Sequence, residues 1–172
     1  MPKSLNIGDL LDLDRMEKNG KTITDYLSSG GVYQDLFHIN DGAMEAKYSQ
    51  GYHHFERQEY PQAIELFTSL TILNPYTKKY WTALAASYMA MEDYAPATLN
   101  YELASTLDEK DPEPCFLAAY GYFMLHDYDR AEQALKLCID VARVSGNQTH
   151  RSLEDRANTL LQEIKKSRLG RG

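Results

Sequence analysis

One four-residue pattern occurs three times in this chain, as Tyr60-Pro61-Gln62-Ala63, Tyr94-Ala95-Pro96-Ala97 and Tyr128-Asp129-Arg130-Ala131. In each copy a tyrosine precedes an alanine by three residues, and successive copies are 34 residues apart. A period of this length is typical of helix-turn-helix repeats, in which each repeat is one antiparallel helix pair. The sequence therefore predicts an array of stacked helix pairs.

Three further positions repeat with the same period. A small residue stands twelve positions before each alanine, where two paired helices must approach closely. A flat ring follows three residues later and fills the gap between the helices, and a large residue stands one turn after each alanine on the same face. In that order they are Gly51, Ala85 and Ala119; His54, Tyr88 and Tyr122; and Phe67, Tyr101 and Leu135. Together with the alanines, these positions form the skeleton of a tetratricopeptide repeat.

The consensus letters of this repeat are only partly present. Trp81, Leu84 and Pro75 match its tryptophan, its neighbouring leucine and its final proline, each in one copy. Glu109 and Arg143 stand where the other two prolines are expected. The resemblance therefore lies in the spacing more than in the letters.

We expect an all-α chain with an N-terminal arm, three tetratricopeptide repeats and a C-terminal capping helix. The predicted boundaries are 1–40 for the partly helical arm, 41–148 for the repeats (about 43–76, 77–110 and 111–144), and 149–172 for the capping helix and a basic tail. The arm contains short amphipathic pieces between glycine and serine breakers. Their apolar residues are Leu5, Ile7, Leu10, Leu11, Leu13, Ile23, Tyr26 and Leu27.

Local signals predict where several helices begin. Asp41 is expected to cap a helix that runs to about Glu56. Asp111-Pro112 is expected to open the third repeat, with the proline at the first helical position. Ser152-x-x-Asp155 resembles a capping box at the start of the last helix. The apolar stripe of that helix is expected to cover the end of the array, and it consists of Leu153, Ala157, Leu160, Leu161 and Ile164.

Composition and motifs argue against several classes of function. The formal charge of −7 disfavours a nucleic-acid surface. No apolar run reaches the roughly 18 residues that span a bilayer, and no leader pattern is found, so a cytoplasmic address is expected. His53 and His54 are adjacent and point apart on a helix, and no phosphate loop or catalytic motif is present. We therefore expect no enzyme activity, no metal and no cofactor, and we expect Cys115 and Cys138 to be buried thiols.

The repeat register predicts a binding groove instead. The first helix of each pair lines the concave side of such an array, and the residues facing it recur at i, i+4 and i+7. They are Tyr48, Tyr52 and Phe55 in the first repeat, Thr82, Ala86 and Met89 in the second, and Phe116, Tyr120 and Phe123 in the third. Two aromatic walls around a shallow centre suit an extended peptide with apolar anchors. The competing interpretation is that these rings are ordinary core.

The same face lacks the cations that would grip a peptide's terminal carboxylate, because an anion must be met by hydrogen-bond donors. The places where lysine, arginine or asparagine would be needed hold Tyr48, Tyr52, Ala83, Glu113 and Leu117, and Lys79 alone is suitable. The sequence therefore predicts a ligand with apolar anchors.

Over residues 30 to about 165 the chain resembles the class II chaperones of bacterial type III secretion, which escort the pore-forming translocator proteins. The segments that carry the resemblance are Gly30-Gly31, Tyr48-x-x-x-Tyr52-x-x-Phe55, Glu59-Tyr60-Pro61-Gln62-Ala63, Leu73-Asn74-Pro75-Tyr76 running into Tyr80-Trp81, Leu107-Asp108-Glu109-Lys110-Asp111-Pro112, and Ala118-Ala119.

The resemblance implies a cytosolic, non-catalytic chaperone that binds an extended segment near the translocator N-terminus, of the type Pro-x-Leu-x-x-Pro, in the concave groove. By position, Tyr48, Tyr52 and Phe55 match the family's pocket residues, and Phe116, Tyr120 and Phe123 are carried over from the third repeat. The family's arm often mediates homodimerisation, for which Leu10, Leu11 and Leu13 would supply apolar side chains.

The alternative is a general repeat adaptor that scaffolds a multiprotein complex through its convex face or through its basic tail, which contains Lys165, Lys166, Arg168 and Arg171. Favourable charge at a helix C-terminus explains such a tail equally well.

Overall fold

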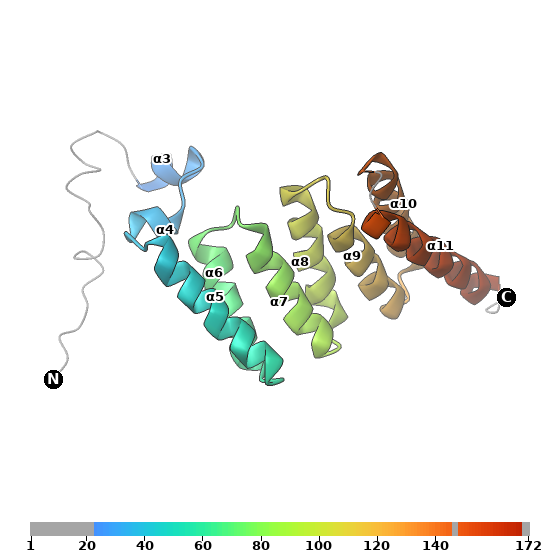
Figure 1. Ribbon diagram of the computed structural model, residues 1–172, viewed down its shortest axis with the longest axis horizontal. Coiled ribbons are helices and arrows are strands. Elements are labelled where there is room, and N and C mark those ends of the chain that lie inside the picture. Colours follow the sequence, from blue (N-terminus) through green and yellow to red (C-terminus); the bar gives the residue numbers. More distant parts are fainter. Residues whose placement is uncertain (1–22, 146–147, 170–172) are drawn as a thin grey trace.

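The structure is a computed structural model that describes residues 23–145 and 148–169. All regular elements in these ranges are helices, so the predicted all-α class is confirmed. Figure 1 shows them as a row that runs in chain order from α3 at one end to α11 at the other. The apolar arm residues before Ile23 lie outside the described residues, as does the predicted dimer contact through them.

Helices α5 to α10 form three antiparallel pairs, and each helix packs against the next one in the chain. Their bounds are α5 Asp41–Glu56 with α6 Tyr60–Leu73, α7 Lys78–Ala90 with α8 Tyr94–Leu107, and α9 Glu113–Met124 with α10 Tyr128–Ser145. The short helices α3 Ile23–Ser28 and α4 Tyr33–Leu36 precede the array, and α11 Gln148–Leu169 follows it.

The turn within each pair is built the same way three times. Two positions after the last residue of the first helix stands a residue in the left-handed conformation, which is Gln58, Glu92 or His126, with φ of 61°, 59° and 61°. The amide of the following residue then donates to a carbonyl five residues earlier, over 2.9, 3.0 and 2.9 Å. This bond satisfies one of the carbonyls that a helix end leaves free. The geometry of the turns therefore recurs with the same 34-residue period as the core positions.

The repeated alanines and the residues one turn later form the interior of the pairs. Ala63, Ala97 and Ala131 are fully buried, and Phe67, Tyr101 and Leu135 are at most 3% exposed. Gly51 faces Phe67 so closely that a Cβ at Gly51 would lie 2.6 Å from Cε1 of the ring. The small residue before each alanine is thus needed where the paired helices cross.

Three predicted helix starts need correction. Asn40, rather than Asp41, caps α5: its Oδ1 accepts from the amide of Ala43 at 2.9 Å, while the Asp41 carboxylate accepts from Gln34 Nε2 at 2.7 Å. Helix α9 begins one residue later than predicted, at Glu113. Pro112 precedes that helix, and the carboxylate of Asp111 still accepts from the Glu113 amide at 2.9 Å.

The last helix also begins earlier than the predicted capping box. Helix α11 starts at Gln148, so Ser152 is an exposed residue inside its second turn. Residues 148–151 contain no glycine or proline, and nothing in them interrupts the helical backbone. The predicted stripe is nevertheless buried against α9 and α10, through Leu153, Ala157, Leu160 and Ile164, with Leu161 half-buried beside it.

The end of α11 is held by ion pairs with the start of α10. Arg168 contacts Asp129 at 2.5 Å and Glu132 at 3.5 Å. This residue of the predicted basic tail therefore meets acidic groups of the chain itself. Both predicted thiols, Cys115 and Cys138, are free and buried, and burial raises the pKa of Cys138 to about 12.

Replacing the left-handed Glu92 with glycine should stabilise the fold. A residue with a Cβ is disfavoured at a φ of 59° and glycine is not, so we expect a gain of about 0.5 to 1 kcal/mol in the free energy of unfolding. Urea denaturation measures it. The control is Glu65→Gly in the middle of α6, where glycine should cost about 1 kcal/mol. A loss of stability in the Glu92 variant would contradict the turn geometry.

Gly51→Ala should destabilise the first helix pair by about 1 to 2 kcal/mol, because its new methyl group would overlap the ring of Phe67. Adding Phe67→Leu should recover part of that loss, which denaturation of the single and double variants would measure. Ser49→Ala, at an exposed position of the same helix, should be nearly neutral. Equal stability of the Gly51 variant and the wild type would show that the helices do not cross at this residue.

Candidate functional site

A cavity of about 490 Å³ opens between α5 and α7. Its lining residues are Tyr48, Tyr52 and Phe55 from α5, Phe67 from α6, and Lys78, Lys79, Thr82, Ala83 and Ala86 from α7. Five predicted groove residues are therefore brought together here: Tyr48, Tyr52, Phe55, Thr82 and Ala86. The place of these residues in a peptide-binding site remains a prediction.

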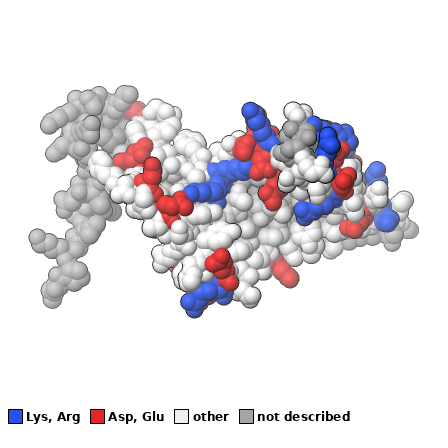
Figure 2. Space-filling model, in the orientation of Figure 1, with Lys and Arg blue, Asp and Glu red and all other residues white. Residues whose placement is uncertain are grey.

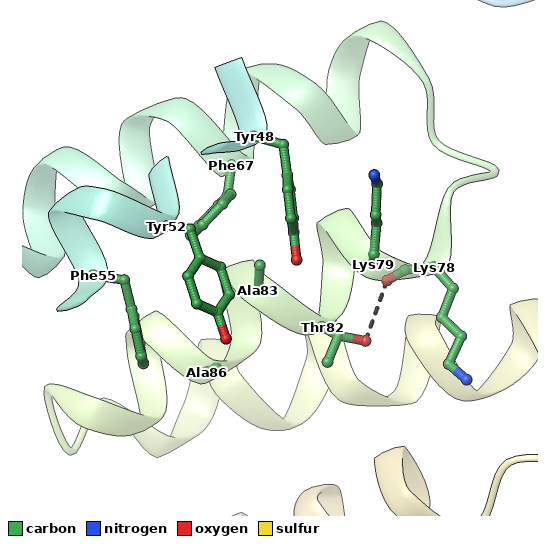
Figure 3. Close-up of a pocket in the computed structure, with 9 residues that line it drawn as sticks. All are labelled: Tyr48, Tyr52, Phe55, Phe67, Lys78, Lys79, Thr82, Ala83 and Ala86. Carbon is green, nitrogen blue, oxygen red and sulfur yellow. Dashed lines mark hydrogen bonds between the residues drawn. The ribbon is translucent and has the colours of Figure 1, made fainter. Parts of the chain in front are cut away.

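One wall of this first cavity is a row of three rings. Figure 3 shows Tyr48, Tyr52 and Phe55 extending side by side from α5 towards α7. Adjacent ring centroids are 6.0 Å apart in both steps. Spacing at i, i+4 and i+7 produces this row because it keeps the side chains on one face of the helix. Tyr52 is 47% exposed, so much of its ring is accessible to a ligand in this cavity.

The opposite wall is made of small side chains. Ala83 and Ala86 lie across from the rings, and Thr82 uses its hydroxyl within α7 by donating to the Lys78 carbonyl at 3.2 Å. Phe67 is fully buried at the floor. The low wall opposite the rings leaves room for apolar side chains of a ligand.

Two lysines border the cavity, and both already have acidic partners. Lys79 pairs with Glu45, and its Nζ lies 4.6 Å from the ring centroid of Tyr48. Lys78 contacts Asp108 at 2.8 Å and also contacts Asp111. Burial alone would lower the pKa of Lys78, but its hydrogen bonds to these carboxylates raise it. Both lysines are therefore charged, but carboxylates of the chain itself pair with them. This pairing suits an apolar ligand, which offers no acid to a lysine.

Sequence reasoning missed Lys78 and Phe67 as lining residues. Lys78 stands four residues before Thr82 on the same helical face, so the spacing could have identified it. Phe67 was assigned to the core, and it serves both roles because the floor of the cavity is the interior of the first pair.

A second cavity, of about 430 Å³, lies further along the same side of the array. Its lining residues are Met89 from α7, Phe116, Leu117 and Tyr120 from α9, and Arg156, Thr159, Leu160 and Glu163 from α11. Three predicted groove residues meet here: Met89, Phe116 and Tyr120. Sequence reasoning gave α11 only a capping role and missed its four residues.

The third-repeat rings differ in how far they reach this second cavity. Tyr120 is 39% exposed, whereas Phe116 is 6% exposed and belongs to the core as well as to the lining. Phe123 lines neither cavity, and its ring centroid is 5.9 Å from that of Tyr128. The competing interpretation of these rings as core thus describes Phe116 and Phe123 better than Tyr120.

Charged side chains of both signs are mixed over the face of the molecule that Figure 2 shows. Figure 2 shows basic and acidic groups side by side, with uncharged surface between the clusters. Within residues 23–145 and 148–169, no group of three or more His, Cys, Asp or Glu side chains could hold a metal ion. In the same ranges, no helix has the length and apolar character needed to cross a membrane.

Comparison with known proteins identifies similar chains, although a scan of family profiles finds none that matches. The low calcium response locus protein H of Yersinia pestis is 26% identical over 140 residues, which cover 81% of this chain and 82% of that protein. The Yersinia enterocolitica type III secretion chaperone SycD, solved with a peptide of the translocator YopD, is 25% identical with a TM-score of 0.68. That match covers 76% of this chain and 98% of SycD.

The chain resembles the type III secretion chaperones in sequence and fold. The resemblance predicted from the repeat segments is therefore confirmed. A type III secretion complex from Aeromonas hydrophila has the same fold, with a TM-score of 0.78 and 22% identity over 85% of this chain and 96% of that one.

The ion pair between Lys78 and Asp108 should make the free energy of unfolding depend on pH in the acidic range. The hydrogen bond from Lys78 lowers the pKa of Asp108 in the folded state. The ion pair therefore contributes fully to the free energy of unfolding above the pKa that Asp108 has in the unfolded chain, and this contribution is lost as pH falls through its folded-state pKa. Lys78→Met should therefore lose less stability than the wild type between about pH 5 and about pH 3.

Urea denaturation across this pH range provides the measurement. Asp108 is partly exposed, so the difference should be small and should shrink in high salt. Lys47→Met, which changes a lysine of α5, is the control and should follow the wild type. Parallel pH profiles of the wild type and the Lys78 variant would show that this pair does not stabilise the fold.

Proposed function

We propose that this chain is a cytoplasmic chaperone of type III secretion translocator proteins, and that it binds an extended, apolar-anchored N-terminal segment of its cargo on the face formed by α5, α7 and α9. The observation that carries the proposal is the row of Tyr48, Tyr52 and Phe55 facing the low wall of Ala83 and Ala86. The chaperone SycD, solved with a translocator peptide, supports the proposal. The activity is binding and not catalysis.

The chemistry of the first cavity favours side chains such as leucine or proline. Rings and methyl groups dominate its lining, and its lysines are paired with carboxylates of the chain. Burying one such side chain contributes about 1.5 to 3 kcal/mol. Association itself costs several kcal/mol, so a stable complex needs several anchors along one extended segment.

Covering such a segment has a direct physical purpose. A protein that inserts into membranes exposes apolar surface before it reaches them, and exposed apolar surface aggregates in water. A chaperone that occupies part of this surface keeps its cargo soluble and competent for secretion.

A second candidate function is a general adaptor that uses the opposite face of the array. Leu99 and Leu103 of α8 and Leu137 of α10 are 57%, 45% and 52% exposed. These exposed leucines would suit a partner that binds this opposite face. The face of the array to which the translocator binds distinguishes the two functions.

Replacing both Tyr52 and Phe55 with alanine should abolish co-purification with a translocator, because the apolar wall would lose two of its three rings. Circular dichroism should show unchanged helicity, since Tyr52 is exposed and Phe55 is only half-buried. The measurement is co-expression of the chain with a translocator and recovery of the complex.

Tyr76→Ala is a matched control, because Tyr76 is 59% exposed and lines neither cavity. It should leave the complex intact. Undiminished recovery with the Tyr52 and Phe55 double variant would refute the groove, and loss of the complex after Leu99→Ala with Leu103→Ala would favour the adaptor.

A further inference from the structure

The second cavity adjoins the first along α7. Ala86 lines the first and Met89 the second, and residues three apart on a helix are neighbours on one face. A chain that leaves the first cavity along α7 therefore reaches Met89 next. Beyond Met89, α11 supplies the far wall of the second cavity, so the helix that caps the array also borders its binding face.

Arg156 distinguishes this cavity from the first one. Its guanidinium carbon lies 4.5 Å from the ring centroid of Phe116. Within the described part of the chain no carboxylate lies within 4.0 Å of it, whereas Lys78 and Lys79 at the first cavity both have such partners. The cation at the second cavity is therefore available to an acid from outside.

The ring of Phe116 contacts the guanidinium of Arg156 beside the second cavity. A guanidinium that lies over an aromatic face keeps its in-plane N–H donors, which match a carboxylate in pairs. Glu163, the acid of this cavity, is seven residues further along α11, or about 10 Å along the helix axis. That separation leaves room for a second carboxylate beside Arg156.

Apolar groups form the rest of the lining. Met89, Leu117 and Leu160 surround the space beside Phe116, and the exposed ring of Tyr120 borders it. The combination of an apolar space with one unpaired cation fits an apolar side chain followed by an acidic one. The formal charge of −7 disfavours acidic ligands in general, so a single acid fixed at Arg156 would set the register of the bound segment.

We propose that the cavity between α7, α9 and α11 is a second subsite for the cargo, which binds a leucine-sized side chain next to an acidic residue, and that Arg156 pairs with this acid. The occupant is a further part of the extended segment that fills the first cavity. This inference rests on the proposed function.

A titration with the peptide acetyl-Ala-Leu-Glu-Ala-amide tests the subsite on the full-length chain, followed by NMR through the amides of Leu117 and Tyr120. Because this peptide offers a single apolar anchor, we expect weak but saturable binding, about fivefold tighter than that of the peptide with Gln in place of Glu, as an exposed ion pair allows. Replacing the peptide's leucine with alanine should weaken binding further. Absence of saturable shifts, or equal affinity of the Glu and Gln peptides, would overturn the proposal.

Arg156→Gln should remove the preference for Glu over Gln. Arg151→Gln is the matched control, since Arg151 is exposed on the same helix and lines neither cavity, and it should keep the preference. A preference that persists in the Arg156 variant would refute the pairing. Comparing the two peptides on the wild-type chain needs no variant and remains decisive if a substitution disturbs the fold.

The purified chaperone–translocator complex tests whether the cargo is the occupant. The tetrapeptide should no longer bind in the complex, and unchanged affinity would overturn the assignment to the cargo. Tyr52→Ala with Phe55→Ala should leave tetrapeptide binding to the free chain intact, because neither residue lines the second cavity. These measurements therefore distinguish an error in the proposed binding at the first cavity from an error in the proposed second subsite.

Discussion

The close crossing of the two helices in each pair is the constraint on which the rest of this structure depends. Gly51 meets the ring of Phe67 with no room for a methyl group, and Ala63 on the partner helix is fully buried. Small residues at the crossing let the two helices of a pair approach closely and pack their interior without voids. Because the crossing recurs every 34 residues, the first helices of all pairs come to lie on one side of the array.

That arrangement explains how the chain can have a well-packed interior and still leave an apolar cavity open at its surface. The crossing positions fill the interior, so the rings at i, i+4 and i+7 of α5 are left to face the first cavity. Ion pairs within the chain occupy the lysines beside them, which leaves a mainly apolar surface between α5 and α7. Exposed apolar surface of this kind is typical of a site that a partner covers, as we propose for the cargo.

The last helix shows how one element serves two purposes. Helix α11 buries Leu153, Ala157 and Ile164 against the final pair, as the end of a repeat array requires. The neighbouring side chains of the same helix, including Arg156 and Glu163, border the second cavity. Capping the array thus also extends the face that we propose for cargo.

The sequence by itself determined the helix pairs, their crossing positions and the ring row of the first cavity, since each depends on spacing within one or two neighbouring helices. Helix ends were less predictable, because Asn40 and Asp41 are both good caps and only the contact of Asp41 with Gln34 separates them. Tertiary structure alone decided that Phe116 is also covered by Arg156, and that Lys79 is paired with Glu45. These contacts join residues at least 34 positions apart, so they depend on how the pairs stack, which no local pattern specifies.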